Sequence, residues 1–111
     1  TLHLTLYWEA RDHVSANYSV FTHVLGEEHR LWAQMDGWPQ GGNAPTAAWA
    51  EGQVIPDPYT LTLAPDTPPG LWEVEIGMYD ETGIRLGVLD PRGHVAGDRI
   101  VLGHVRIVPE P

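Results

Sequence analysis

The stretch that decides the fold is LHLTLYWE, residues 2–9. Apolar and polar side chains alternate along it, with Leu2, Leu4, Leu6 and Trp8 on one side and His3, Thr5, Tyr7 and Glu9 on the other. A period of two is that of a β-strand with one face in a core and the other in water. The sequence therefore predicts a half-buried strand here.

Further segments alternate in the same way or are rich in β-branched and aromatic residues. Besides the first, we expect strands at residues 18–25, 31–36, 59–63, 71–80, 84–86 and 99–108, about seven in all. Turn signals such as Pro68-Pro69-Gly70 and Asp80-Glu81-Thr82-Gly83 separate them, and no segment has helical periodicity over three turns. The chain is therefore predicted to be all-β, an antiparallel two-sheet β-sandwich of immunoglobulin-like or jelly-roll type.

Two of these strands carry specific expectations about their faces. In residues 71–80 the carboxylates of Glu73 and Glu75 fall on the face opposite the apolar side chains, which is most simply the solvated side of a sheet. In residues 99–108 we expect Val101, Val105 and Ile107 to share one face, while Gly103 either weakens the middle of the strand or marks a bulge.

Length and composition limit the architecture and the partners. The 111 residues fit one domain, 1–111, and the chain opens directly in a strand, so we expect a single β-sandwich domain excised from a larger protein. The net charge of −9 argues against nucleic acid as a partner. The apolar runs are far shorter than the roughly 20 residues of a membrane helix, so we expect no direct membrane insertion by this segment.

The residues that usually carry chemistry are sparse. There is no cysteine or lysine, and Ser15 and Ser19, the two serines, lie in no nucleophile motif. Six histidines form no pair at metal-binding spacing, although His23, between Phe21 and Leu25, is expected to be partly buried and bonded to carboxylates. We therefore assign no catalytic residue, no metal site and no cofactor.

A long connection, residues 37–53, holds two of the five tryptophans. Trp38 and Trp49 combine flat apolar faces with the hydrogen-bonding groups of nearby Asp36, Gln40 and Asn43, as sites for sugar rings do. The alternative is that one or both indoles fold inward and fix the loop to the sandwich, since large aromatic side chains in loops are usually buried.

Several fragments, in this order and spacing, resemble a known family of domains. They are Leu4–Trp8, Tyr18–Leu25, Asp36-Gly37, Pro45-Thr46 with Trp49, Asp57-Pro58-Tyr59, Pro68-Pro69-Gly70 and Gly77-Met78-Tyr79-Asp80. The chain resembles, over nearly its whole length, an extracytoplasmic β-sandwich domain appended to polytopic bacterial glycosyltransferases that are similar to the dolichyl-phosphate-mannose protein mannosyltransferases, as in Chloroflexi-type bacteria.

The resemblance implies a location and a context. The domain would lie on the extracytoplasmic face of the cytoplasmic membrane, tethered through the full-length protein, with the membrane-embedded part of the same polypeptide as a partner. No catalytic residue is carried over, because the acidic catalytic residues of such transferases lie in loops between membrane helices. In the matching pattern, Asp80 with Gly83 suits a tight hairpin, and Arg85 is expected to pair with Asp80 or Asp57.

Two functions follow as alternatives. The first is a non-catalytic accessory domain that acts as a structural or interaction module, which predicts an exposed apolar patch or an unpaired sheet edge. The second is a carbohydrate-binding module that recognises a glycan or cell-envelope component, with Trp38, Trp49, Asp36, Asn43, Asp57 and Tyr59 as its candidate ligand-binding residues.

Overall fold

The computed structural model describes residues 1–109 and contains eight strands in that range. Their bounds are β1 Leu2–Glu9, β2 Ser19–Leu25, β3 Leu31–Gly37, β4 Val54–Leu61, β5 Gly70–Tyr79, β6 Val88–Leu89, β7 Val95–Gly97 and β8 Ile100–Ile107. Three short 3-10 helices lie in the connections: η1 Glu27–His29, η2 Pro39–Gly42 and η3 Thr46–Ala48. The expected all-β fold is confirmed.

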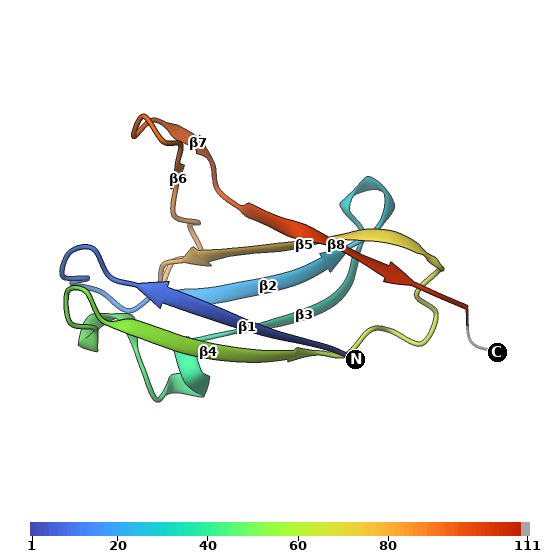
Figure 1. Cartoon of the computed structure of the whole chain (residues 1–111), viewed down its shortest axis with the longest axis horizontal. Coiled ribbons are helices and arrows are strands. Elements are labelled where there is room, and N and C mark those ends of the chain that lie inside the picture. The colour runs from blue at the N-terminus through green and yellow to red at the C-terminus, as the bar shows by residue number, and fades with distance from the viewer. Residues whose placement is uncertain (110–111) are drawn as a thin grey trace.

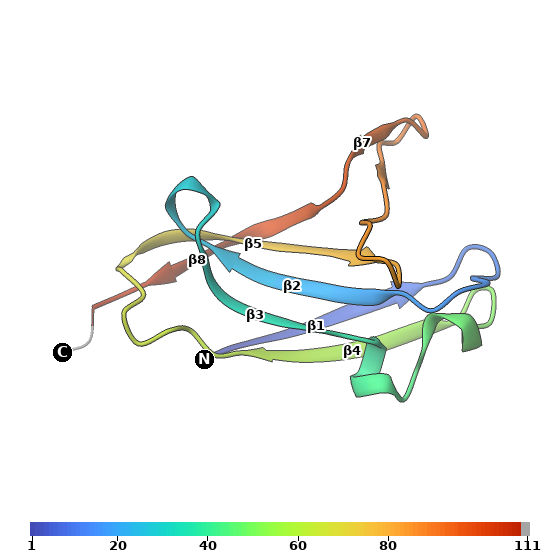
Figure 2. The ribbon, with the colours of Figure 1, turned by 180° about the vertical axis from the view of Figure 1, so that it is seen from behind.

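Two antiparallel sheets form the layers of a sandwich. One has four strands in the order β3-β2-β5-β8, and the other consists of β1 and β4 alone. Figures 1 and 2 show the two-stranded sheet lying along one face of the larger sheet, while β6 and β7 form a separate hairpin that projects from the body. This is the predicted two-sheet arrangement with one additional hairpin, β6–β7.

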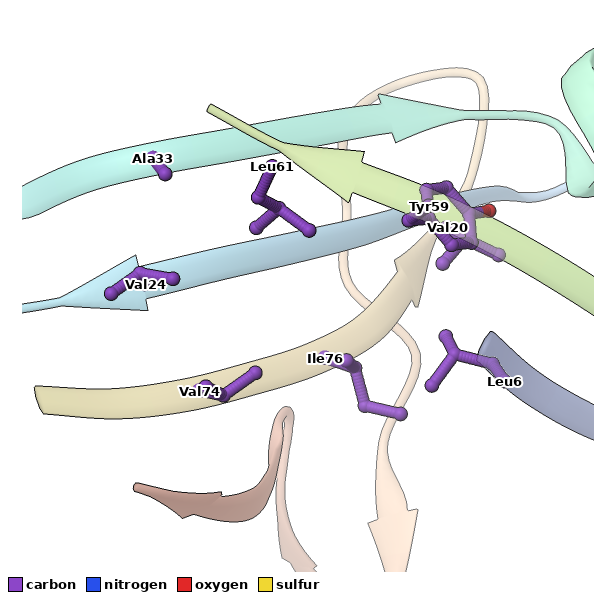
Figure 3. Packing of buried hydrophobic residues seen from close by; sticks show 8 residues of the cluster. All are labelled: Leu6, Val20, Val24, Ala33, Tyr59, Leu61, Val74 and Ile76. Carbon is purple, nitrogen blue, oxygen red and sulfur yellow. The ribbon is translucent and has the colours of Figure 1, made fainter. Parts of the chain in front are cut away.

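The core fills the space between the sheets, as Figure 3 shows. Leu6, Tyr59 and Leu61 enter it from the two-stranded sheet. They meet side chains from three strands of the larger sheet: Val20, Val24, Ala33, Val74 and Ile76. Each strand contributes alternate residues, so the period of two read in the sequence corresponds directly to burial in β1, where Leu6 is buried and Thr5 and Tyr7 are exposed.

Strand β4 begins five residues earlier than the 59–63 segment predicted for it. Residues 54–61 alternate strictly between exposed and buried, with Pro56 and Pro58 on the exposed side. Both prolines pair with β1 residues, Pro56 with Tyr7 and Pro58 with Thr5. Being two residues apart, they share one edge of the strand. The Pro56 carbonyl accepts a hydrogen bond from Gln40 Nε2, outside the β1–β4 ladder, so this edge faces away from β1 and the missing N–H groups cost no ladder hydrogen bond.

The last strand contains a bulge, one of the two alternatives considered at Gly103, and the bulge corrects the assignment of faces. Val74 pairs with Gly103 and Glu75 pairs with Val101, so Leu102 is an extra residue. Val105 pairs with Trp72 and faces the core, whereas Val101, opposite Glu75, lies on the other face. The prediction that Val101 shares a face with Val105 was wrong because one inserted residue reverses the alternation.

The short strand expected at residues 84–86 is not formed. Only an isolated bridge between Tyr79 and Arg85 occurs there. The regular pairing is further on, between β6 and β7, and we call residues 84–98 the arm. Two turns of the same design bound its first half: Asp80 Oδ1 accepts the N–H groups of Thr82 and Ile84, and Asp90 Oδ1 accepts those of Arg92 and His94.

Candidate functional site

The long connection between β3 and β4 is ordered by buried contacts. Trp49 is only 6% exposed, packs with Ala10 and Ile55, and donates its Nε1–H to the Ala44 carbonyl at 2.8 Å. Its ring lies 6.5 Å from that of Trp8. Trp49 therefore fixes the loop to the sandwich, which is the structural alternative weighed for it.

Asp57 is the centre of a buried hydrogen-bond network. Its carboxylate has no exposed surface and accepts three hydrogen bonds: from Trp8 Nε1 at 3.0 Å, from the Gln40 backbone N–H at 2.7 Å and from the Tyr59 hydroxyl at 2.7 Å. The Gln40 bond ties η2 of the long connection to β4. A buried carboxylate needs such donors, so Asp57 joins β1, the loop and the core.

The six candidate ligand-binding residues therefore separate into two groups. Trp49, Asp57 and Tyr59 are buried, and their polar atoms are bonded inside the protein, so they shape the loop from within. Trp38, Asp36 and Asn43 are exposed. The sequence could not separate these groups, because nothing in the local pattern tells an inward indole from an outward one.

The buried network makes Tyr59 sensitive to alkaline pH. Burial, and then its hydrogen bond to Asp57, raise the pKa of the Tyr59 phenol above its ordinary value of 10. The folded state therefore keeps this proton at a pH where the unfolded chain loses it, so the stabilisation is complete below pH 10 and declines above it. Each such phenol contributes at most about 1.4 kcal/mol per pH unit, less where water screens it.

We expect Tyr59→Phe to reduce this alkaline loss of stability, measured by urea unfolding between pH 9 and pH 11. The chain has no lysine or cysteine, so tyrosines are the main side chains that titrate in this range. The control is Tyr7→Phe at an exposed position, which should leave the slope unchanged. An equal slope in the two variants would show that Tyr59 does not hold its proton in this way.

A second polar cluster lies on the outer face of the four-stranded sheet, around Glu75. This side chain was expected to be solvated, but Glu75 is only 3% exposed. Its carboxylate lies 2.7 Å from His23 Nδ1, 3.1 Å from Arg99 Nη1 and 3.7 Å from Arg85 Nη2. Three partners from different parts of the chain therefore shield the Glu75 carboxylate, which the alternation of the strand predicted to be exposed to solvent.

The carboxylates around Glu75 are paired as well. Arg99 also donates to Glu73 at 2.8 Å, which lowers the pKa of the Glu73 carboxyl and raises the pKa of Arg99. Asp36 lies 3.6 Å from His23 and accepts a hydrogen bond from the Tyr79 hydroxyl at 3.2 Å. The structure thus confirms the expected partly buried, carboxylate-bonded His23 and places Asp36 in this cluster.

Arg85 has partners other than the two predicted. It lies 3.5 Å from Asp98, and its guanidinium stacks 4.2 Å from the centre of the Phe21 ring. Asp80 is occupied by its own turn and Asp57 by the buried network, so neither is available to Arg85. Pairing with Asp80 or Asp57 was therefore a wrong expectation.

Arg85 and Arg99 lie at the two ends of the arm, and both reach Glu75. One arginine is near the start of the arm and the other directly follows it, so Glu75 on β5 holds both ends against the sheet. A cleft of about 340 Å³ lies beside these groups, lined by His23, Leu25, His29, Leu31, Glu75, Arg85 and Arg99. Because Arg85 and Arg99 both pair with Glu75, the cluster around Glu75 anchors the arm to the sheet.

The arm itself presents apolar side chains to solvent. Leu89 is 61% exposed and Val95 is 71% exposed, and Ile84 at its base is exposed as well. Beyond the arm, Ile100, Val101 and Leu102 of β8 are also exposed, and in residues 1–109 β8 is paired along one edge only. Leu89 and Val95 are paired neighbours on the arm, and adjacent exposed apolar side chains are typical of interaction sites. The hairpin that carries these side chains was not predicted from the sequence, although two Asp-containing turns ten residues apart, at Asp80 and Asp90, could have indicated it.

Neither a metal site nor a membrane span is found in the part that the structure describes. Residues 1–109 contain no group of three or more His, Cys, Asp or Glu side chains placed to hold a metal ion. No helix in the same range is long and apolar enough to cross a bilayer. Comparisons with protein-family models, with curated proteins and with solved structures give no match.

Proposed function

We propose that this chain is a non-catalytic accessory module that works by interaction, docking through its arm onto the membrane-embedded part of a glycosyltransferase-like polypeptide at the extracytoplasmic face of the membrane. The observation that supports the proposal is the arm, with its exposed Leu89 and Val95. The membrane and glycosyltransferase context comes from the resemblance described above.

The anchoring of the arm supports a docking role. An apolar hairpin that moved freely would lose conformational entropy on binding, which weakens affinity. Here the ends of the arm are held by Arg85 and Arg99 on Glu75, and the turn at its tip is closed by Asp90. The arm therefore offers its apolar side chains in an ordered position.

Site-specific photo-crosslinking tests this proposal in cells that produce the full-length polypeptide. A photoreactive amino acid is placed at Leu89 or Val95 on the arm. The controls are Val54, 56% exposed, and Tyr7, 70% exposed, on the two-stranded sheet, which match the arm positions in exposure. We expect crosslinks to membrane-embedded segments from the two arm positions and none from the two controls, because exposure alone does not bring a side chain to a partner.

Glycan recognition is the second candidate function. Three of the six residues considered for sugar binding are exposed at the surface: Asp36, Trp38 and Asn43. A stronger observation in its favour lies at the other end of β3, where two other tryptophans line a cleft.

A further inference from the structure

The β2–β3 and β4–β5 connections form a cleft at one end of the sandwich. In Figure 2 these connections, coloured cyan and yellow, lie close to each other at the same end of the molecule. The cleft has a volume of about 260 Å³ and is lined by Glu27, Arg30, Trp32, Pro68, Pro69 and Trp72. This is slightly below the roughly 300–1,000 Å³ of sites for drug-sized ligands, so the space suits a single small ring.

The two indoles in this cleft are held by glycines. A Cβ on Gly26 would overlap the Trp32 ring, and a Cβ on Gly70 would lie 2.6 Å from the Trp72 ring. Trp72 is also fixed by a hydrogen bond from its Nε1 to the Pro68 carbonyl at 2.9 Å. Both rings are therefore seated against backbone, in defined positions, while remaining only partly buried.

Polar groups accompany the rings. The Arg30 guanidinium lies 4.4 Å from the centre of the Trp32 ring, and Glu27 is exposed on the same connection. Trp32 Nε1 makes no hydrogen bond to any residue in the range 1–109 and is not buried, so it is a free donor. One negative and one positive side chain line the cleft, which gives it no net charge and favours a neutral ligand.

We infer that this cleft binds a neutral glycan by stacking the apolar face of one sugar ring against an indole. A pyranose ring has a C–H face that packs on aromatic surface and hydroxyl groups around its edge. The carboxylate of Glu27 accepts hydrogen bonds from such hydroxyls, and Arg30 and the free Trp32 Nε1 donate to their oxygens. Polyanionic glycans are disfavoured by the net charge of −9. The inference rests on glycan recognition, the second candidate function.

The indole N–H signals provide the direct test, in two-dimensional ¹H–¹⁵N NMR spectra of the purified chain. Neutral oligosaccharides of glucose, mannose and N-acetylglucosamine, up to hexamers, are titrated to 20 mM. The five tryptophans give five distinct reporters. We expect saturable shifts for Trp32 and Trp72 with at least one sugar series, and no shift for Trp8 and Trp49, whose Nε1 atoms are bonded inside the protein.

Two variants and a matched control locate the binding. Trp32→Ala should weaken the affinity about tenfold or more, as loss of an aromatic stacking partner does. Glu27→Gln removes one hydroxyl acceptor without changing the size of the side chain and should weaken binding severalfold. Trp38→Ala removes an exposed indole at the other end of β3 and should leave the affinity unchanged. Unfolding midpoints confirm that each variant is folded.

The outcomes separate the cleft from glycan binding in general. Saturable shifts confined to Trp38 would overturn the assignment to this cleft and leave glycan recognition to the long connection. The absence of any saturable shift would overturn both. Binding of a proline-rich peptide to the cleft, with no sugar bound, would overturn the choice of ligand.

Discussion

Asp57→Ala is expected to lower the free energy of unfolding by about 3–5 kcal/mol, the range for removing one member of a buried charged network. The substitution leaves three donors without their acceptor: the Trp8 indole N–H, the Gln40 backbone N–H and the Tyr59 hydroxyl. Natural domains of this size are stable by only about 5–15 kcal/mol, so this loss brings the chain close to unfolding. Urea unfolding followed by circular dichroism measures it.

Two further variants make this result specific. Asp57→Asn keeps a single carbonyl oxygen where the carboxylate has two, so we expect an intermediate loss. Asp66→Ala, at an exposed aspartate in the β4–β5 connection, should change the free energy of unfolding by less than about 0.5 kcal/mol. If Asp57→Ala were as mild as Asp66→Ala, the network would not be holding the long connection to the sandwich.

Gly77→Ala is expected to lower the free energy of unfolding by about 2–3 kcal/mol, the cost of overpacking a filled site. A Cβ at Gly77 would overlap the Phe21 ring and lie 3.2 Å from the Asp98 carbonyl oxygen. The ring has little freedom to move, because it is buried and the Arg85 guanidinium stacks on it. Thermal or urea unfolding of the purified chain gives the value.

Gly37→Ala is the matched control for Gly77→Ala. It also lies in a strand of the four-stranded sheet, and a Cβ there would have open space around it. This substitution should be neutral or slightly stabilising, since alanine has fewer conformations to lose than glycine.

Combining Gly77→Ala with Phe21→Leu should cost less than the sum of the two changes, because the smaller side chain leaves room for the Cβ. Strict additivity would contradict the contact.

The strands were predictable because their signal is local. In β1 and β5 apolar and polar side chains alternate along the strand; burial follows the alternation in β1, whereas in β5 four consecutive residues, 74–77, are buried. The early start of β4 was missed because Pro56 and Pro58 argue against a strand unless its edge position is known. The reversed face of Val101 depends on one inserted residue opposite Val74, whose position the sequence does not specify beyond the nearby Gly103.

The candidate sites were less predictable because they depend on contacts between distant residues. The burial of Glu75 requires His23 on the neighbouring strand β2, together with Arg85 and Arg99 at the two ends of the arm. Trp32 and Trp72 meet in one cleft only because two connections come together at the same end of the sandwich. Strand order determines both arrangements, and strand order could not be read from the sequence.

Crosslinking from Leu89 and Val95 in the full-length polypeptide is the decisive test of the docking proposed for the arm. We expect both arm positions to crosslink to membrane-embedded segments, and the similarly exposed Val54 and Tyr7 to give no such crosslinks. Equal crosslinking from all four positions, or crosslinks from Val54 and Tyr7 alone, would contradict it.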